Sequence, residues 1–251
     1  MNLIISALLL GRKGSKGFPG KNTKNVSGHP LAYYPMKAAL NCPQVDNVYL
    51  STDDEALMGI AKENGVRIII RPTELCSDNA LGEHAFVHGY EEIKKMNPGK
   101  DIELMVLLFC NAPTITPQTI SEGIRILKGN LEYDSAVTVS KYNMWSPLRA
   151  RKIGDDGLLH PFIPFENFGD PKILNCDRDS QGDVWFADMG ASIVRPHCLE
   201  NLENGLLPQK WMGQKIYPLK QWGGLDVDYE WQIPQVEYWL RKHGIGDLHD
   251  K

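Results

Sequence analysis

The sequence predicts an α/β fold, in which a mostly parallel central sheet is flanked by helices. Three observations support this prediction. Apolar runs alternate with helix-length segments over residues 3–140, as in sheets built from strand–helix–strand units. The first of these runs is continuous and ends at a glycine-rich loop, which is typical of a buried parallel strand. The chain has 251 residues, 42% of them hydrophobic and 23% charged, so it can bury a sizeable core.

The first strand is predicted at Leu3–Leu10, an apolar run in which Ser6 is the one polar residue and which is bounded by Gly11. A helix is expected over Leu31–Leu40, since Pro35 can be accommodated in its first turn or two. Val45–Leu50 is predicted to be the second strand. These elements together make the first strand–helix–strand unit.

The next helix is expected over Asp54–Asn64, where Ser51–Asp53 can cap its start and Gly65 can end it. A third strand is predicted at Val66–Ile70, and Pro72 fixes an extended exit from it. The second unit therefore repeats the order of the first.

The pattern continues with a helix at Leu81–Lys95, a strand at Leu104–Phe109, a capped helix at Thr116–Gly129 and a strand at Ser135–Val139. In open α/β sheets, ligands bind beyond the carboxyl ends of the strands. We therefore expect the functional residues in the loops that follow the strands.

Residues 141–187 interrupt this pattern. They are rich in Pro, Gly, Asp and aromatic residues, and we expect an insert of loops or short hairpins. Ala191–Val194 and Ile216–Leu219 are predicted to return to the sheet, and Trp231–His243 to form a terminal helix. The chain is thus predicted to be a single domain, residues 1–251, that carries one insert.

Charge and cysteine content narrow the classes of partner. The net charge is −4, yet residues 1–45 contain six Lys or Arg and no Asp or Glu. This asymmetry predicts a local anion site and no nucleic-acid surface. The five cysteines lack C-x-x-C spacing, so neither a zinc site nor a redox dithiol is indicated. No apolar run approaches the roughly 20 residues of a membrane span, and no signal peptide is evident, so we expect a cytoplasmic protein.

A basic, glycine-rich loop, Gly11–Asn22, directly follows the first strand. Glycines let backbone N–H groups approach an anion, and Arg12, Lys16 and Lys21 add positive charge. The glycine spacing matches neither the P-loop nor the G-x-G-x-x-G pattern of dinucleotide-binding folds. The loop is therefore predicted to bind phosphates, and the alternative is a solvated basic loop.

Two carboxylates, Asp226 and Asp228, flank Val227 near the end of the chain. With Val227 pointing inward, both carboxylates would leave a strand on the same side, where they could hold Mg²⁺, a cation that prefers oxygen ligands. The alternative is a strand end with an N-cap aspartate for the last helix.

Arg71 follows the third strand and could reach a bound nucleotide. The alternative is that its charge is paired with Glu74 or Asp78. His84 and His88 are spaced for a metal, but no third ligand is evident, so we expect surface or packing roles for them.

Together these motifs resemble the CMP-sialic acid (acylneuraminate) synthetases, the cytidylyltransferase family that activates nonulosonic acids. The order and spacing agree over about residues 3–140 and 188–243. The matching residues are Arg12, Ser15, Lys16, Gly17, Pro19, Lys21 and Asn22 in the first motif, Ser51–Asp53 in the second, Arg71, Pro72, Glu74, Leu75, Ser77 and Asp78 in the third, and Asp226 and Asp228 in the last.

The resemblance implies a nucleotidyltransferase fold with a small dimerisation arm, and CTP and Mg²⁺ as ligands. It implies that the loop cradles the triphosphate, with Lys21 at the α-phosphate. Arg12 and Lys16 would then stabilise the leaving pyrophosphate. The other residues implied to bind the nucleotide are Gly14, Ser15, Gly17, Asn22, Arg71, Asp78 and Ala80, and those implied to bind the metal are Asp226 and Asp228.

The chain departs from the family where the sugar acid is expected. Phe109 stands where related synthetases have a Gln, and Ile115 stands where they have an Arg. Residues 187–189 also lack the Arg-Pro-Asn that sialate enzymes often carry. The candidate acceptor-binding residues are therefore Arg149, Phe109 and Asn111.

The expected activity is transfer of CMP from CTP to an acidic acceptor of the nonulosonic, sialic-like type, with release of pyrophosphate. One alternative is the same transfer to another acid, such as a 3-deoxy-octulosonate or a phosphonate. Others are a metal-dependent nucleotide-sugar glycosyltransferase and a non-catalytic nucleotide-binding protein. We also expect a homodimer in which the 141–187 insert helps to form the acceptor pocket of the neighbouring subunit, because the insert is rich in aromatic residues.

Overall fold

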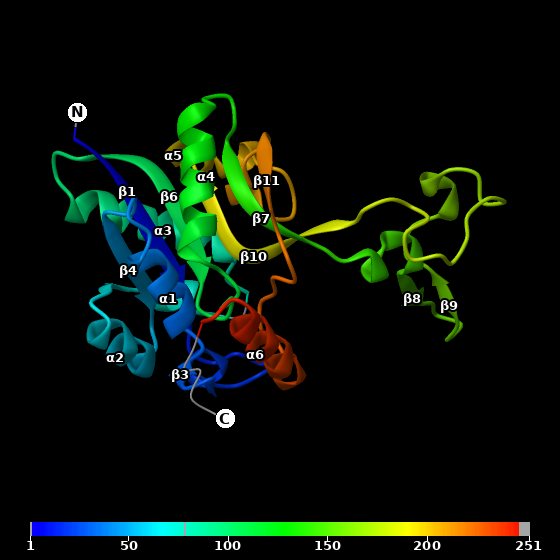
Figure 1. The fold of residues 1–251 in the computed structure, drawn as a ribbon, viewed down its shortest axis with the longest axis horizontal. Coiled ribbons are helices and arrows are strands. Elements are labelled where there is room, and N and C mark those ends of the chain that lie inside the picture. The colour runs from blue at the N-terminus through cyan, green and yellow to red at the C-terminus, as the bar shows by residue number, and fades with distance from the viewer. Residues whose placement is uncertain (1, 78, 246–251) are drawn as a thin grey trace.

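The computed structural model describes residues 2–77 and 79–245, and it is built around a seven-stranded sheet (Figure 1). The strands follow one another across the sheet in the order β11–β7–β10–β6–β1–β4–β5. All neighbours are parallel except at β10, which is antiparallel to both β6 and β7. The strands are β1 (Leu3–Leu10), β4 (Asn47–Thr52), β5 (Arg67–Ile70), β6 (Asp101–Phe109), β7 (Ser135–Lys141), β10 (Trp185–Val194) and β11 (Ile216–Gln221). The predicted fold class, a mostly parallel sheet flanked by helices, is confirmed.

Helices cover both faces of the sheet. The α-helices are α1 (Tyr33–Leu40), α2 (Glu55–Glu63), α3 (Gly82–Met96), α4 (Pro117–Gly129), α5 (Pro196–Glu200) and α6 (Ile233–Lys242). One core joins the sheet to α1, α2 and α4, and a second core joins its other face to α3 and α5. Short 3₁₀ helices occupy Lys21–Thr23, Thr73–Leu75, Asn143–Trp145, Pro147–Arg149, Phe165–Phe168, Leu202–Asn204, Lys210–Met212 and Glu230–Gln232.

Strand β1 shows why its sequence is apolar at every position except Ser6. Ile5, Ala7 and Leu9 point into the first core, whereas Leu8 and Leu10 point into the second. Successive side chains of a strand alternate between its faces, so a strand that is covered on both sides needs apolar residues throughout. The predicted bounds of this strand are confirmed.

A third, smaller core holds the last helix against the start of the chain. It joins α6 to the hairpin of β2 (Asn25–Val26) and β3 (His29–Pro30). Val227 is completely buried in this core beside Trp239. The core therefore fixes the segment that contains Asp226 and Asp228 next to the N-terminal loop.

The helix caps agree with the prediction at α4 and differ at α2. Thr116 caps α4, where its Oγ1 accepts a hydrogen bond from the backbone N–H of Thr119 at 3.1 Å. Helix α2 is capped by Asp54, whose carboxylate accepts from Ala56 N at 2.9 Å. The expectation that Ser51–Asp53 cap this helix is wrong, because the sheet extends to Thr52 and the helix begins later.

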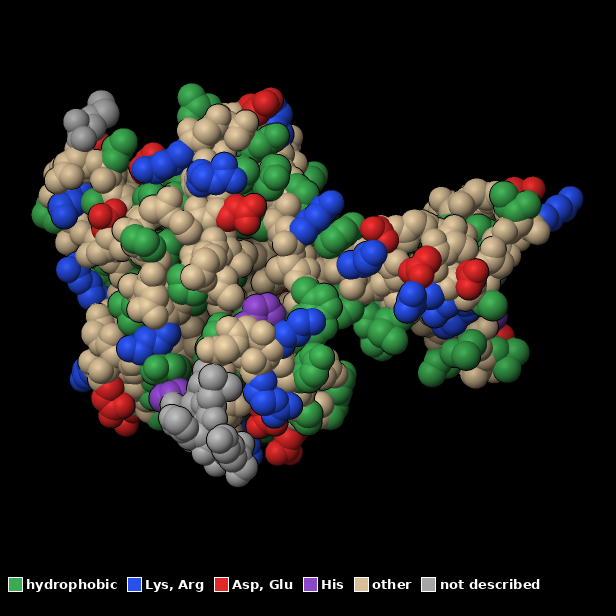
Figure 2. Space-filling view, viewed as in Figure 1, with side chains coloured by type: hydrophobic (Ala, Val, Ile, Leu, Met, Phe, Trp, Pro, Cys, Tyr) green, Lys and Arg blue, Asp and Glu red, His purple; other side chains and the backbone are tan. Residues whose placement is uncertain are grey.

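The insert forms an arm that projects away from the sheet (Figure 1). Strands β7 and β10 lead into it, and it contains a hairpin of β8 (Arg151–Ile153) and β9 (Leu159–Pro161). Several of its apolar side chains are exposed, among them Trp145 at 63% and Phe162 at 62%. Figure 2 shows hydrophobic side chains gathered on the arm. No helix in the described part of the chain is long and apolar enough to cross a membrane.

Candidate active site

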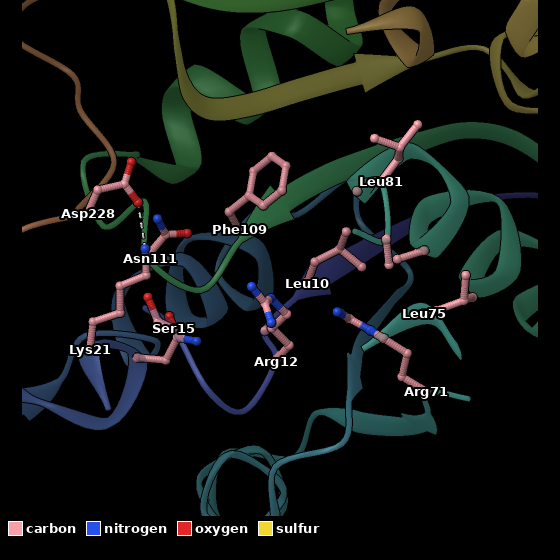
Figure 3. Close-up of a pocket in the computed structure, with 15 residues that line it drawn as sticks. Leu10, Arg12, Ser15, Lys21, Arg71, Leu75, Leu81, Phe109, Asn111 and Asp228 are labelled. Carbon is pink, nitrogen blue, oxygen red and sulfur yellow. Dashed lines mark hydrogen bonds and ion pairs between the residues drawn. The ribbon is translucent and has the colours of Figure 1, made fainter. Parts of the chain in front are cut away.

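A cavity of about 310 Å³ opens beyond the carboxyl ends of β1 and β6, where the parallel sheet predicts a ligand (Figure 3). Its wall comes from four separate parts of the sequence: the glycine-rich loop, residues 71–85, residues 109–111 and Asp228. The predicted site residues that line it are Arg12, Ser15, Lys21, Asn22, Arg71, Ala80, Phe109, Asn111 and Asp228. Distant motifs of the sequence therefore share one cavity.

The other predicted residues lie near this cavity, apart from it or outside the described residues. Gly14, Lys16 and Gly17 belong to the same loop but do not line the cavity. Asp226 precedes Val227 in the adjoining segment and does not line the cavity, and Arg149 lies in the arm. Asp78 lies outside the residues that the structure describes.

The glycine-rich loop is held by the end of β4. Gly11 donates its N–H to the carbonyl of Ser51 at 3.3 Å, and Lys13 donates its N–H to Asp53 Oδ1 at 2.9 Å. The Ser-Thr-Asp motif therefore supports this loop instead of capping a helix. The motif lies directly after a parallel strand, at the same edge of the sheet as the loop. This position in the sequence could have predicted its role.

Glycine is needed at two positions of the loop for different structural reasons. Gly14 has a φ of +80°, a left-handed conformation that favours glycine. Gly17 packs against the segment of the carboxylates, since a Cβ there would come within 2.8 Å of the carbonyl oxygen of Asp228. The loop and the carboxylate segment are thus in direct contact.

Arg71 is buried beneath the cavity and bonded to Ser51. Its Nε donates to Ser51 Oγ at 3.2 Å, and one terminal nitrogen donates to the Ser51 carbonyl at 2.6 Å. Burial lowers the pKa of Arg71, and the charge of Arg12 contributes in the same direction. Arg12 in turn donates to the carbonyl of Cys76 at 3.2 Å. Two guanidinium groups therefore approach the cavity together, and an anion there would stabilise both (Figure 3).

Lys21 faces Asp228 at the other side of the cavity (Figure 3). Lys21 Nζ lies 2.6 Å from Asp228 Oδ1, with the lysine side chain 12% exposed and the aspartate 58% exposed. Next to Lys21, the side chain of Asn22 is buried, and its Oδ1 has no hydrogen-bond partner among the described residues. A buried acceptor of this kind fits a ligand that brings a hydroxyl or amino group.

The segment of Asp226 and Asp228 is not a strand, although Val227 points inward as expected. It is held instead by the loop after β6. Val227 N donates to the Asn111 carbonyl at 2.8 Å, and Asn111 Nδ2 donates back to the Val227 carbonyl at 3.1 Å. Thr114 Oγ1 exchanges hydrogen bonds with the backbone of Leu225 in the same way. The alternative of an N-cap is wrong, because the following 3₁₀ helix is capped by Tyr229.

The carboxylates of this segment suit a hard cation. Burial raises the pKa of Asp226, and the neighbouring charge of Asp228 raises it further. A cation bound between them would relieve both effects. Mg²⁺ prefers oxygen ligands and is commonly held by one or two carboxylates together with substrate phosphates. The oxygen donors of Asp228, which lines the cavity, and of Asp226, two residues before it, fit this pattern.

Two of the three candidate acceptor residues, Phe109 and Asn111, line the cavity of one chain, whereas Arg149 does not. Phe109 lines the cavity and packs edge-on against Phe86, with ring centroids 5.2 Å apart. Ile115 is buried in the first core and adds nothing to the cavity wall. Arg149 is exposed in the arm, where its guanidinium donates to the carbonyl of Cys176. The wall beside Phe109 is therefore aromatic.

Comparison with known proteins places these observations in one family. The family model described as cytidylyltransferase matches residues 6–153, more than half of the chain. The chain is 26% identical to the N-acylneuraminate cytidylyltransferase of Oncorhynchus mykiss over 232 residues, which cover 92% of this chain and 49% of that protein. It is 30% identical to the CMP-N,N'-diacetyllegionaminic acid synthase of Legionella pneumophila over 156 residues, 62% of this chain and 65% of that protein.

The chain spans about half the length, or less, of the first curated relatives that it matches. Among solved structures, it resembles CMP-2-keto-3-deoxy-manno-octonic acid synthetase in complex with CTP, with a TM-score of 0.67 and 15% identity. That match covers 97% of this chain and 100% of the other. The 4-diphosphocytidyl-2C-methyl-D-erythritol synthase of Anaerococcus prevotii has the same fold, with a TM-score of 0.60, 13% identity, and 95% and 96% of the two chains covered.

Proposed function

The chain belongs to the cytidylyltransferase family, and from this premise we propose that it transfers CMP from CTP to an acidic sugar of the nonulosonic, sialic-like type. The observation that carries the proposal is the convergence of Arg12, Lys21 and Arg71 on one cavity beside Asp228. Three positive side chains from separate motifs favour a polyanionic ligand. The names of the relatives, which act on acylneuraminate and legionaminic acid, support the class of acceptor.

In the proposed reaction, an oxygen of the acceptor attacks the α-phosphorus of CTP, and pyrophosphate leaves. The chain contributes mainly positioning and charge stabilisation, as is usual in phosphoryl transfer. Lys21 would contact the α-phosphate, while Arg12 and Lys16 would offset the charge of the leaving pyrophosphate. Asn22 and Arg71 would hold the nucleoside side, where the unpartnered Asn22 Oδ1 can accept a hydrogen bond.

Magnesium is part of this proposal. Asp226 and Asp228 would hold the ion, since Asp228 lines the cavity and Asp226 lies two residues before it in the same segment. A bound Mg²⁺ would neutralise charge on the phosphate oxygens. Asn111 would keep this segment in place through its two hydrogen bonds to Val227.

The nature of the acid is the finer part of the proposal. The aromatic wall at Phe109 replaces the amide of the related synthetases, so transfer to a 3-deoxy-octulosonate or a phosphonate is the second candidate. The similarity of fold to CMP-2-keto-3-deoxy-manno-octonic acid synthetase is compatible with it.

Nucleotide preference tests the proposed function most directly. The protein is incubated with Mg²⁺, a panel of sialic-like acids, 3-deoxy-octulosonate and phosphonates, and each of CTP, UTP, ATP and GTP, while pyrophosphate release is followed. We expect release to depend on one of the acids and to be fastest with CTP. Equal rates with all four nucleotides, or release that no acid stimulates, would overturn the proposal.

The active form in this proposal is a homodimer. Arg149 carries positive charge in an arm whose apolar side chains are exposed, and it does not line the cavity of its own chain. An arm of the neighbouring subunit would bring this charge to the acidic acceptor. Nucleic acids and membranes have no part in the proposal, and the cytoplasmic location stays a prediction.

A further inference from the structure

Asp188 is a buried carboxylate that the proposed reaction does not use. It is 5% exposed and lies in β10, close to the point where the arm begins. Its oxygens accept three hydrogen bonds: from Ser140 Oγ at 2.6 Å, from Gln221 Nε2 at 2.9 Å and from the N–H of Gly190 at 3.1 Å. A carboxylate is costly to bury unless it is well hydrogen-bonded, and here the donors come from three different strands.

An irregularity in β10 places this carboxylate. The pairing of β10 with β7 shifts register between Ala187 and Ser192. Met189, inside this shift, has a φ of +59°, an uncommon conformation for a residue with a side chain. Bulges of this kind often direct a side chain toward a functional site. The strand is thus distorted at the residue that follows Asp188.

The hydrogen bonds of Asp188 continue to the segment that carries the predicted metal ligands. Ser140 Oγ donates to Asp188 and accepts the N–H of Gly224 at 2.8 Å. The hydroxyl of Tyr142 donates to the carbonyl of the same Gly224, also at 2.8 Å. A Cβ on Gly224 would lie 2.4 Å from Asp188 Oδ2, so the backbone at this glycine packs directly on the carboxylate.

Gly224 lies two residues before Asp226, in a stretch with no strand partner. Backbone groups outside regular structure must find partners elsewhere, and Ser140 and Tyr142 provide them at Gly224. Asn111 provides them at Val227, on the other side of Asp226. The carboxylate segment is therefore fixed at Gly224, at Leu225 by Thr114, and at Val227, and the first of these points depends on Asp188.

We propose that Asp188 is a positioning residue that, through Ser140, anchors Gly224 and so sets the placement of Asp226 and Asp228 at the cavity. The catalytic part of this inference rests on the proposed function, whereas the anchoring itself does not. Residues that orient metal ligands typically change metal affinity or activity by about 10- to 100-fold when they are removed.

Ser140→Ala removes the hydrogen-bonded link between Asp188 and Gly224 without removing the buried charge of Asp188. Ser135→Ala is the matched control, because Ser135 lies on the same strand, is equally buried, and donates its hydroxyl to a backbone carbonyl, that of Met212 at 2.5 Å. The first measurement is amide hydrogen exchange of residues 222–228 in the protein without substrate. We expect faster exchange there in Ser140→Ala and no change in Ser135→Ala.

The second measurement is the dependence of the rate on Mg²⁺ and on CTP. We expect Ser140→Ala to lower kcat by about 10-fold or more and to raise the Mg²⁺ concentration that gives half the maximal rate, with little change in the KM for CTP. Asp188→Asn, which keeps the shape and one acceptor, should retain more activity than Asp188→Ala.

Two outcomes would overturn the inference: unchanged exchange over residues 222–228 in Ser140→Ala, or the same loss of kcat in Ser135→Ala. A wild-type protein that releases no pyrophosphate would instead remove the proposed function. In that case hydrogen exchange still decides whether Asp188 and Ser140 anchor the segment.

Discussion

Lys21 and Asp228 form an ion pair, although in the proposed reaction they bind different ligands, the α-phosphate and the metal ion. At 2.6 Å the contact is strong, and the lysine side chain is largely buried. A triphosphate at Lys21 and a cation at Asp228 would supply each side chain with a new partner of opposite charge. The pair therefore keeps two charged groups oriented at the cavity, and each charge offsets part of the cost of removing the other from water.

Lys21→Ala should lower kcat by about 100-fold or more, because it removes a contact to the phosphate at which charge develops. The thermal unfolding midpoint should change little, since the side chain lies at the wall of a cavity and not in a core. Lys24→Ala is the control, because Lys24 is an exposed neighbour paired with Glu230 at 3.6 Å. Similar rates for Lys21→Ala and Lys24→Ala would contradict the role given to the loop.

Asp228→Asn should remove most of the activity, and added Mg²⁺ should restore it only in part, because a carboxamide binds Mg²⁺ more weakly than a carboxylate. Rates measured over a range of Mg²⁺ concentrations show this as a shifted and lowered saturation curve. Glu230→Gln removes an exposed carboxylate close by and should leave the curve unchanged. Full activity without any divalent cation would show that the metal assignment of Asp226 and Asp228 is wrong.

The residues of the site were predictable to different degrees. Arg12, Lys21 and Arg71 could be selected because the loops that follow parallel strands meet at one edge of the sheet. The role of Asp188 could not, because it depends on a bulge and on partners in two other strands. Arg71 shows the same limit, since its described hydrogen-bond partner is Ser51, whereas the possible partner Asp78 lies outside the described residues.

At the scale of elements, continuous apolar strands were predicted best. The bounds of Leu3–Leu10 were predicted correctly because both faces of this strand are covered, so that apolar residues extend to both of its ends. Strand β10 begins well before the predicted Ala191, because the polar and glycine residues of its bulge interrupt the apolar pattern. The segment of Asp226 was predicted as a strand, but side chains hold its backbone instead of a neighbouring strand.

The two adjacent carboxylates Asp53 and Asp54 should have separable roles. Asp54→Ala removes the cap of α2 and should lower the free energy of unfolding by about 1 kcal/mol, with the KM for CTP unchanged. Asp53→Ala frees the N–H of Lys13 and should raise the KM for CTP several-fold by loosening the loop. Denaturant titration and steady-state kinetics distinguish the two. An Asp53→Ala protein that only loses stability would restore the interpretation of this residue as part of a cap.

At the scale of the whole molecule, the body and the arm differ in the exposure of their apolar side chains. The body buries its apolar residues in three cores, whereas the arm exposes Trp145, Ile153 and Phe162. Exposed aromatic and aliphatic side chains of this kind are enriched where proteins associate. Trp145 and Phe162 are too exposed to be packed on the sheet of their own chain. A second copy of the chain is the partner that we expect.

Mixing two inactive variants tests whether subunits share a site. Lys21→Ala disables the cavity of its own chain, and Arg149→Ala disables the arm that we expect to serve the neighbouring chain. In a mixed dimer one site then carries both defects and the other carries neither, so activity should return after subunit exchange. A mixture of two separately prepared Lys21→Ala samples is the control and should stay inactive. No recovery after verified exchange, or a monomer in sedimentation at micromolar concentration, would exclude the shared site, and Arg149 would then have no route to an acceptor in the cavity.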